Sequence, residues 1–161
     1  MSQFQLKGVD ELRKKLEMLR GEAVDKAIRS ATGTGAKVIR ESAIANVASL
    51  NDPNTPEDIG KNIVQRPTPK RYRQMGEVKI RIGVLGGAKA PKENGSIRTS
   101  GKKPLPGGDT YYWRFLEFGT NKIAARPFMR PAMGSGQAAF DAFSTKLDKR
   151  LNRLLKIKKT K

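Results

Sequence analysis

The sequence predicts an α+β fold in which an antiparallel sheet, with a long basic hairpin loop, is covered by N-terminal helices and a C-terminal helix. Near both ends of the chain, apolar residues recur at the spacing of an amphipathic helix. Residues 78–84 alternate apolar and basic side chains, as a half-buried strand does. Residues 110–118 follow a glycine-rich stretch and are largely apolar on both faces, which favours a central aromatic strand.

Two helices are expected in the N-terminal third, at residues 9–20 and 22–48. Acidic residues at the start of the first suit the positive end of a helix. The second carries a stripe of small residues, which would let another element approach closely. Gly33 and Gly35 each weaken it by roughly 1 kcal/mol relative to Ala. The sequence is therefore compatible with either one kinked helix or two separate helices over residues 22–48.

The middle of the chain predicts shorter elements. Four prolines between residues 51 and 75 prevent a long helix there. Ile59, Ile63 and Val64 fit either a turn of helix or a brief strand. In the following strand, Lys79 and Arg81 occupy the outer face.

Residues 86–109 show no periodicity and are expected to form a flexible loop or arm between two strands. The C-terminal helix is expected at residues 136–156, followed by a basic tail at 157–161. Its apolar stripe consists of Phe140, Phe143, Leu147, Leu151 and Leu154. The length of 161 residues fits a single α+β domain, 1–161.

Composition excludes several classes of function. The chain has no cysteine and no histidine, so disulfides, thiolate chemistry and Ser-His catalysis are absent, and ordinary zinc sites are not expected. No apolar run suggests a membrane helix or an export signal. The sequence contains neither the phosphate-binding motif GxxxxGK(S/T) nor the dinucleotide-binding motif GxGxxG. We therefore expect no enzyme activity, cofactor or metal, and no membrane partner.

The net charge of +18 predicts a polyanionic neighbour or strongly acidic protein surfaces. General solubility is the alternative, although this charge exceeds what solubility requires. If the neighbour is DNA, the contacts would be phosphate contacts that read no sequence. The candidate DNA-facing residues are Lys79, Arg81, Lys89, Lys92, Arg98, Lys102 and Lys103.

Residues 111–132 hold the most distinctive pattern. They contain five of the nine Phe and Tyr residues and the only Trp. These rings could stack on bases, but a central strand favours core packing. Gly119 is placed to adopt a positive φ angle at the end of the strand. Glu117 lies on an aromatic face and needs a partner, for which Arg126 and Arg130 are the candidates in the segment that follows. Such a pair is either a clamp that orders the next segment or a plain surface pair.

Residues 126–131 read Arg-Pro-Phe-Met-Arg-Pro, and the two prolines predict an extended, stiff segment. A stiff segment that carries an aromatic side chain loses little entropy on docking. Alternatively, Phe128 covers the protein's own core.

The ordered motif of residues 112–132 resembles the neck or tail-completion proteins of long-tailed siphophages, of the lambda minor tail protein Z type. Members typically carry Glu-aromatic-Gly-Thr, then Arg-Pro-Phe-hydrophobic-Arg-Pro-Ala. Their helix start also resembles residues 8–12, whereas residues 50–75 and the longer arm depart from the family's pattern. The resembling positions are Glu117, Phe118, Gly119, Thr120, Arg126, Pro127, Phe128, Met129, Arg130, Pro131 and Ala132.

The resemblance implies a virion structural protein at the head–tail junction, assembled in the host cytoplasm as a ring around the DNA path, a hexamer by tail symmetry. Its partners would be its own copies, other neck, connector or tail-tube proteins, and packaged DNA. The expected assembly residues are Glu117, Gly119, Thr120, Arg126, Pro127, Phe128, Arg130 and Pro131. The alternative function is a free-standing basic nucleic-acid-binding protein.

Overall fold

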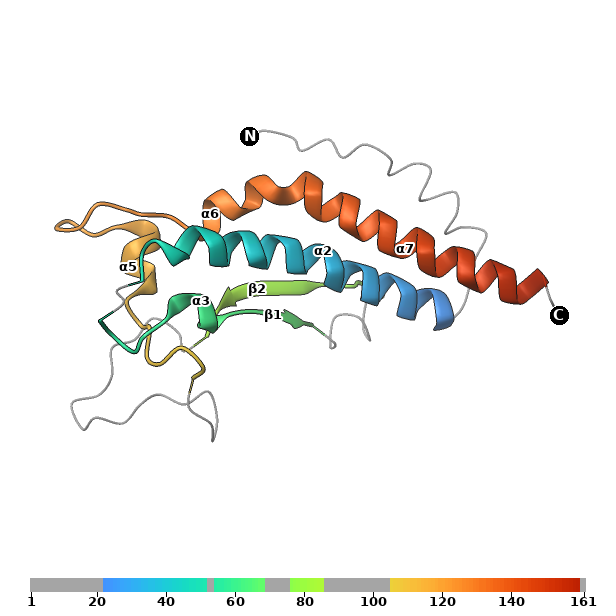
Figure 1. Ribbon diagram of the computed structural model, residues 1–161, viewed down its shortest axis with the longest axis horizontal. Helices are drawn as coiled ribbons and strands as arrows, with labels where there is room; N and C mark the ends of the chain where they lie inside the picture. The colour runs from blue at the N-terminus through green and yellow to red at the C-terminus, as the bar shows by residue number, and fades with distance from the viewer. Residues whose placement is uncertain (1–21, 52–53, 69–75, 86–104, 160–161) are drawn as a thin grey trace. The chain divides into compact units, whose positions relative to one another are not determined.

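The structure, a computed structural model, describes residues 22–51, 54–68, 76–85 and 105–159, with residues 155–159 described by their backbone (Figure 1). The helix expected at residues 9–20 and most of the 86–109 arm lie outside these ranges. Figure 1 traces helix α2, then α3, strands β1 and β2, and helices α5, α6 and α7 in chain order. A single 3-10 turn, Met133–Ser135, joins α6 to α7.

The sheet has two antiparallel strands, β1 (Ile63–Pro67) and β2 (Ile80–Val84). Backbone hydrogen bonds fix its register at both ends: Thr68 donates to Lys79 O at 2.9 Å, and Leu85 donates to Asn62 O at 2.9 Å. The α+β class and the strand expected at residues 78–84 are confirmed. The turn of helix and the strand considered for residues 59–64 both exist, as α3 (Ile59–Asn62) followed by β1.

The aromatic stretch is a helix, not a strand. α5 spans Trp113–Phe118, so β2 pairs with β1 and the expected hairpin from β2 to residues 110–118 is wrong. The core-facing side chains of this stretch are Tyr112, Trp113 and Leu116. Their spacing is that of one face of a helix, not the alternation of a strand. Packing of that stripe outweighs the strand preference of aromatic residues.

The chain divides into two compact units. The first contains the start of α2 (Glu22–Ala48), up to Val38, and α7 (Gly136–Lys159). These two segments share a core, to which α7 contributes four of the five predicted stripe residues: Phe143, Leu147, Leu151 and Leu154, with Leu147 and Leu151 buried. A Cβ atom at Gly35 would lie 2.7 Å from Ala139 O, so α7 approaches α2 where the small-residue stripe predicted a close neighbour.

The second unit contains the rest of α2, α3, most of the sheet, α5 and α6 (Met129–Ala132). α2 runs unbroken through Gly33 and Gly35, which selects the single-helix alternative. The buried core of this unit draws on three separate stretches of the chain, residues 43–47, 59–63 and 128–132. Its members are Ala43, Val47, Ile59, Ile63, Phe128 and Ala132.

Candidate assembly site

The Glu117 carboxylate caps helix α6. Glu117 is 2% exposed and comes from α5, whereas its partners come from the segment eleven to thirteen residues further on. Its Oε2 accepts hydrogen bonds from the backbone N–H groups of Phe128 at 2.8 Å and Met129 at 2.9 Å. Its Oε1 accepts from the backbone N–H of Arg130 at 3.0 Å. One buried carboxylate therefore satisfies the N–H groups at the start of α6 that have no partner within the helix.

The Arg130 side chain completes this arrangement. Its Nε lies 3.3 Å from Glu117 Oε1, and its Nη2 donates to the Glu117 carbonyl oxygen at 2.6 Å. The Arg130 Cζ also lies 5.4 Å from the centroid of the Phe118 ring, within range of a cation–π interaction. Of the two candidate partners, Arg126 and Arg130, the structure selects Arg130. We call Glu117, Arg130 and the first residues of α6 the Glu117 lock.

Opposing effects act on the pKa of Glu117. Burial removes the carboxylate from water and raises the pKa, but hydrogen bonds from the Met129, Phe128 and Arg130 N–H groups, and from the Arg130 side chain, lower it. The net effect is a pKa below the ordinary glutamate value. Glu117 is therefore charged at neutral pH, and the lock is a charge-assisted one.

Gly119 turns the chain away from α5 with φ = 74°, as the sequence predicted. A Cβ atom at this position would lie 2.9 Å from Ala125 N and 3.0 Å from Ile123 O, so only glycine fits. The Thr120 N–H donates to Ile123 O at 2.9 Å, and the Arg126 N–H donates to Leu116 O at 2.7 Å. These bonds close residues 119–126 into a loop that returns against α5.

The segment at residues 126–131 is not extended throughout. Phe128 is 0% exposed in the core, so the alternative in which it covers the protein's own core is the one observed, and it offers no docking ring. Its backbone begins a helix because Glu117 supplies the cap that the local sequence lacks. The expected assembly residues with exposed side chains are Thr120, Arg126, Pro127, Arg130 and Pro131.

A comparison with protein-family models matches residues 10–119 to the family described as "Bacteriophage HK97-gp10, putative tail-component". The chain belongs to this family of phage tail components. The match covers α2, the sheet and α5, and it ends at Gly119, so the α6 half of the Glu117 lock lies beyond it. No curated protein matches this tail component. No solved structure matches it either.

The structure locates only part of the expected DNA-facing set of the tail component. Lys79 and Arg81 are both exposed and flank Ile80 at the start of β2. The other expected cations, Lys89, Lys92, Arg98, Lys102 and Lys103, lie outside the described residues.

Asn62 is a second buried polar centre, and no motif in the sequence marks it. Its Nδ2 donates to Gly108 O at 2.9 Å and to Thr110 Oγ1 at 2.8 Å, and its Oδ1 accepts from the Gly107 N–H at 2.9 Å. Its backbone carbonyl accepts from Leu85. The residues on either side of the 86–104 stretch are therefore both bonded to Asn62. The sequence does hold one indication of this role: Asn62 lies between two apolar residues, Ile59 and Ile63, that are themselves buried, so its amide needs partners within the protein.

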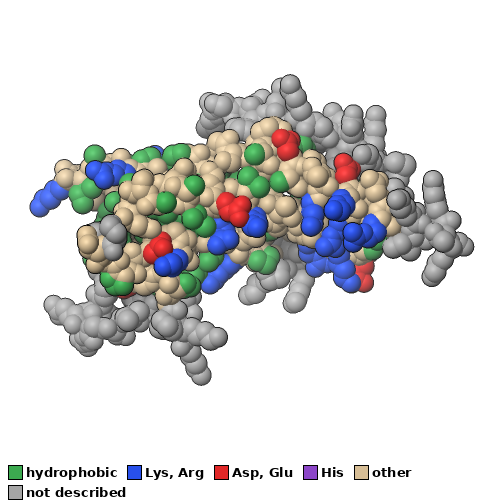
Figure 2. Space-filling model, viewed as in Figure 1, with side chains coloured by type: hydrophobic (Ala, Val, Ile, Leu, Met, Phe, Trp, Pro, Cys, Tyr) green, Lys and Arg blue, Asp and Glu red, His purple; other side chains and the backbone are tan. Residues whose placement is uncertain are grey.

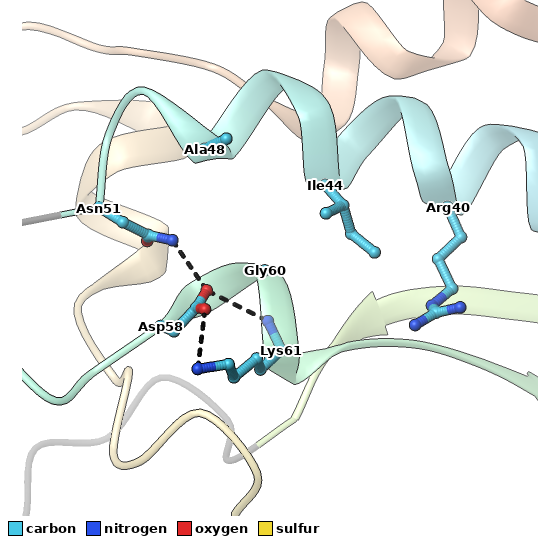
Figure 3. A pocket seen from close by; sticks show the side chains of 7 residues that line it. All are labelled: Arg40, Ile44, Ala48, Asn51, Asp58, Gly60 and Lys61. Carbon is cyan, nitrogen blue, oxygen red and sulfur yellow. Dashed lines mark hydrogen bonds and ion pairs between the residues drawn. The ribbon is translucent and has the colours of Figure 1, made fainter. Parts of the chain in front are cut away.

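A shallow pocket of about 300 Å³ opens between α2 and α3 in the same unit (Figure 3). Asp58 lies on its rim and is already satisfied, by Asn51 Nδ2 at 2.8 Å, the Lys61 N–H at 3.3 Å and Lys61 Nζ at 3.4 Å. Burial raises the pKa of Asp58, but these bonds outweigh it and lower the pKa below the ordinary value. Arg40 Nε donates to Ile63 O at 2.9 Å. The polar side chains of Asp58 and Arg40 in this pocket are therefore engaged in bonds that stabilise the fold.

Among the described residues, no group of His, Cys, Asp and Glu side chains is arranged to hold a metal ion. Within the same residues, no helix combines the length and apolar character needed to cross a bilayer.

Proposed function

We propose that this tail component is a virion structural protein at the head–tail junction, of the neck or tail-completion class, that assembles as a ring around the DNA path. The observation that supports this position most directly is the net charge of +18 on a tail component. A charge of this size suits a surface beside a polyanion, and the polyanion of a virion is its packaged DNA. We further propose that the protein is of the lambda minor tail protein Z type and that its ring is a hexamer.

The role is structural rather than catalytic. The chain has no histidine and no cysteine, and the buried carboxylate of Glu117 is fully engaged in capping α6. We assign the assembly contacts to the exposed members of residues 119–131 and to the 86–109 arm. Lys79, Arg81 and the arm cations are the candidates for facing DNA.

Two measurements test the proposal. Mass spectrometry of purified virions, together with electron microscopy of virions that carry a labelled copy, reports whether the chain is present and where. Light scattering on a sizing column, with and without duplex DNA, reports its oligomeric state. The proposal predicts the label at the head–tail joint and a discrete oligomer in solution or on tails. A chain absent from virions that gains mass only with DNA would favour the free-standing DNA-binding protein.

A further inference from the structure

An exposed apolar surface lies on α5 and the turn that follows it. Phe115 is 43% exposed, Phe118 is 61% exposed and Ile123 is 50% exposed. Phe115 and Phe118 are one helical turn apart and share a face of α5. Ile123 is held beside the end of that helix because its carbonyl accepts the Thr120 N–H at 2.9 Å. We call these three residues the α5 apolar surface.

The exposed charges of the stretch that carries this surface have one sign. The stretch from Trp113 to Ala132 contains a single carboxylate, Glu117, which is buried in its lock. Hydrophobic and basic side chains lie side by side on the loop that projects at the left of the space-filling view (Figure 2). The four exposed cations of this stretch are Arg114, Lys122, Arg126 and Arg130.

The surface is also rigid before it binds anything. The Glu117 lock joins the end of α5 to α6, and the bond from the Arg126 N–H to Leu116 O joins the returning loop to α5. The Arg130 guanidinium lies over the Phe118 ring and restricts it. A preorganised apolar surface loses little conformational entropy on association.

We propose that the α5 apolar surface docks onto a different protein of the virion, through an apolar contact on that protein that is rimmed by carboxylates. This inference rests on the proposed structural role in the virion. An apolar centre with a charged rim is the usual arrangement of a protein interface, and the four cations fit carboxylates on the opposite side.

The same features disfavour two other occupants. A second copy that used this same surface would present the same basic rim, and like charges across an interface are repulsive. A copy that used another surface, as in a ring, would draw on a chain with 33 cations for 15 carboxylates. Duplex DNA offers phosphates to the cations but no apolar surface for the exposed rings, because its bases are stacked inside. As a stacking platform for single strands the surface is poor, since Ile123 is aliphatic and Arg130 already lies over Phe118.

The test places the photo-crosslinking residue p-benzoylphenylalanine at position 118 of the full chain during virion assembly. Irradiated virions are then analysed by mass spectrometry of the crosslinked peptides. The result expected is a crosslink to another virion protein, at a segment that carries Asp or Glu. A crosslink to a second copy of this chain would overturn the inference, and so would a crosslink to DNA. The inference would also fail if position 118 gave no crosslink while the same probe at the exposed position of Lys149 did.

Matched variants give a second readout. Phe118→Ser should lower the amount of chain in purified virions by about ten-fold or more, as loss of an interface anchor does. Met133→Ser is the control, because Met133 is 63% exposed and lies outside the surface. Arg126→Glu should also lower incorporation, whereas the same charge change at Lys149 should not. Equal incorporation of Phe118→Ser and Met133→Ser would overturn the inference, while absence of the wild-type chain from virions would instead overturn the proposed function.

Discussion

At the scale of single residues, the Glu117 carboxylate determines how residues 128–130 fold. Three backbone N–H groups and one guanidinium converge on a side chain that is 2% exposed. Removing the charge weakens every one of these bonds, and an amide in its place turns one acceptor atom into a donor. The lock is therefore worth more than a surface ion pair.

We expect Glu117→Gln to lower the free energy of unfolding at pH 7 by roughly 2–4 kcal/mol, because buried N–H groups lose a charged acceptor. Denaturant unfolding followed by circular dichroism measures this difference. The control is Glu22→Gln, which removes an exposed carboxylate 2.9 Å from Lys26 and should change stability little. Equal effects of the two substitutions would contradict the lock.

The same substitution has a predictable pH dependence. The folded protein lowers the pKa of Glu117, so its carboxylate contributes stability above the ordinary glutamate pKa of about 4.3. That contribution is lost as the pH falls through the lowered pKa. The difference between wild type and Glu117→Gln should therefore be largest near neutral pH and shrink below about pH 4. A difference that grows on acidification would show that the carboxylate is not held in its charged form.

Asn62 carries the third prediction at this scale. Asn62→Ala leaves the Gly107 N–H, the Gly108 carbonyl and the Thr110 hydroxyl without their partner, and should cost roughly 2–4 kcal/mol. Hydrogen exchange should speed up at Gly107. Asn152→Ala, at an exposed position on α7, is the control and should leave exchange at Gly107 unchanged. Unchanged exchange in Asn62→Ala would contradict the assigned bonds.

At the scale of elements, substitutions at two glycines on α2 distinguish the effect of helix propensity on stability from the effect of packing against α7. A Cβ atom at Gly33 would find nothing nearer than Ile80 Cδ1 at 4.0 Å, whereas one at Gly35 would lie 2.7 Å from the Ala139 carbonyl oxygen. Gly33→Ala should raise stability by about 0.5–1 kcal/mol through helix propensity. Gly35→Ala should instead lower it by roughly 1–3 kcal/mol, because α7 must shift. Thermal unfolding of both variants checks the opposite signs, and a gain in both would contradict the close approach.

The sequence identified the elements in which apolar side chains keep to one side, either over many helical turns or, in β2, by strict alternation with basic residues. α2, β2 and α7 all carry such a pattern, and each lies where it was predicted. α5 was mistaken for a strand because its six residues, Trp113–Phe118, span less than two turns, too short for period two and period 3.6 to be separated. α6 could not be foreseen from local residues, because its cap comes from Glu117 on another element.

The candidate site was predictable to a similar extent. A carboxylate on an aromatic face pointed to a cation partner, and Arg130 is that partner. The backbone N–H groups that share the carboxylate depend on the fold of residues 128–130, which the prolines alone suggested would be extended. Phe128 was weighed as either a docking or a core side chain, and only its three-dimensional neighbours decide that it belongs to the core.

At the scale of the whole molecule, the net charge of +18 opposes self-association and favours DNA binding, and salt acts on the two in opposite directions. The Debye length falls from about 10 Å at 0.1 M salt to about 3 Å at 1 M, so repulsion between copies is screened. The proposed ring should therefore persist or grow in mass as salt rises. Binding to duplex DNA should weaken as salt rises, because counterions compete for the phosphates.

Light scattering across this salt range, with and without duplex DNA, measures both trends on one sample. Phe118→Ser should leave the DNA-bound mass unchanged at every salt concentration, because a phosphate contact does not use an apolar ring. Arg81→Glu, at an exposed position on β2, should reduce it most at low salt. If the oligomer instead dissolves with rising salt in step with DNA release, the association depends on nucleic acid. The ring would then form only on DNA or on a tail that contains it.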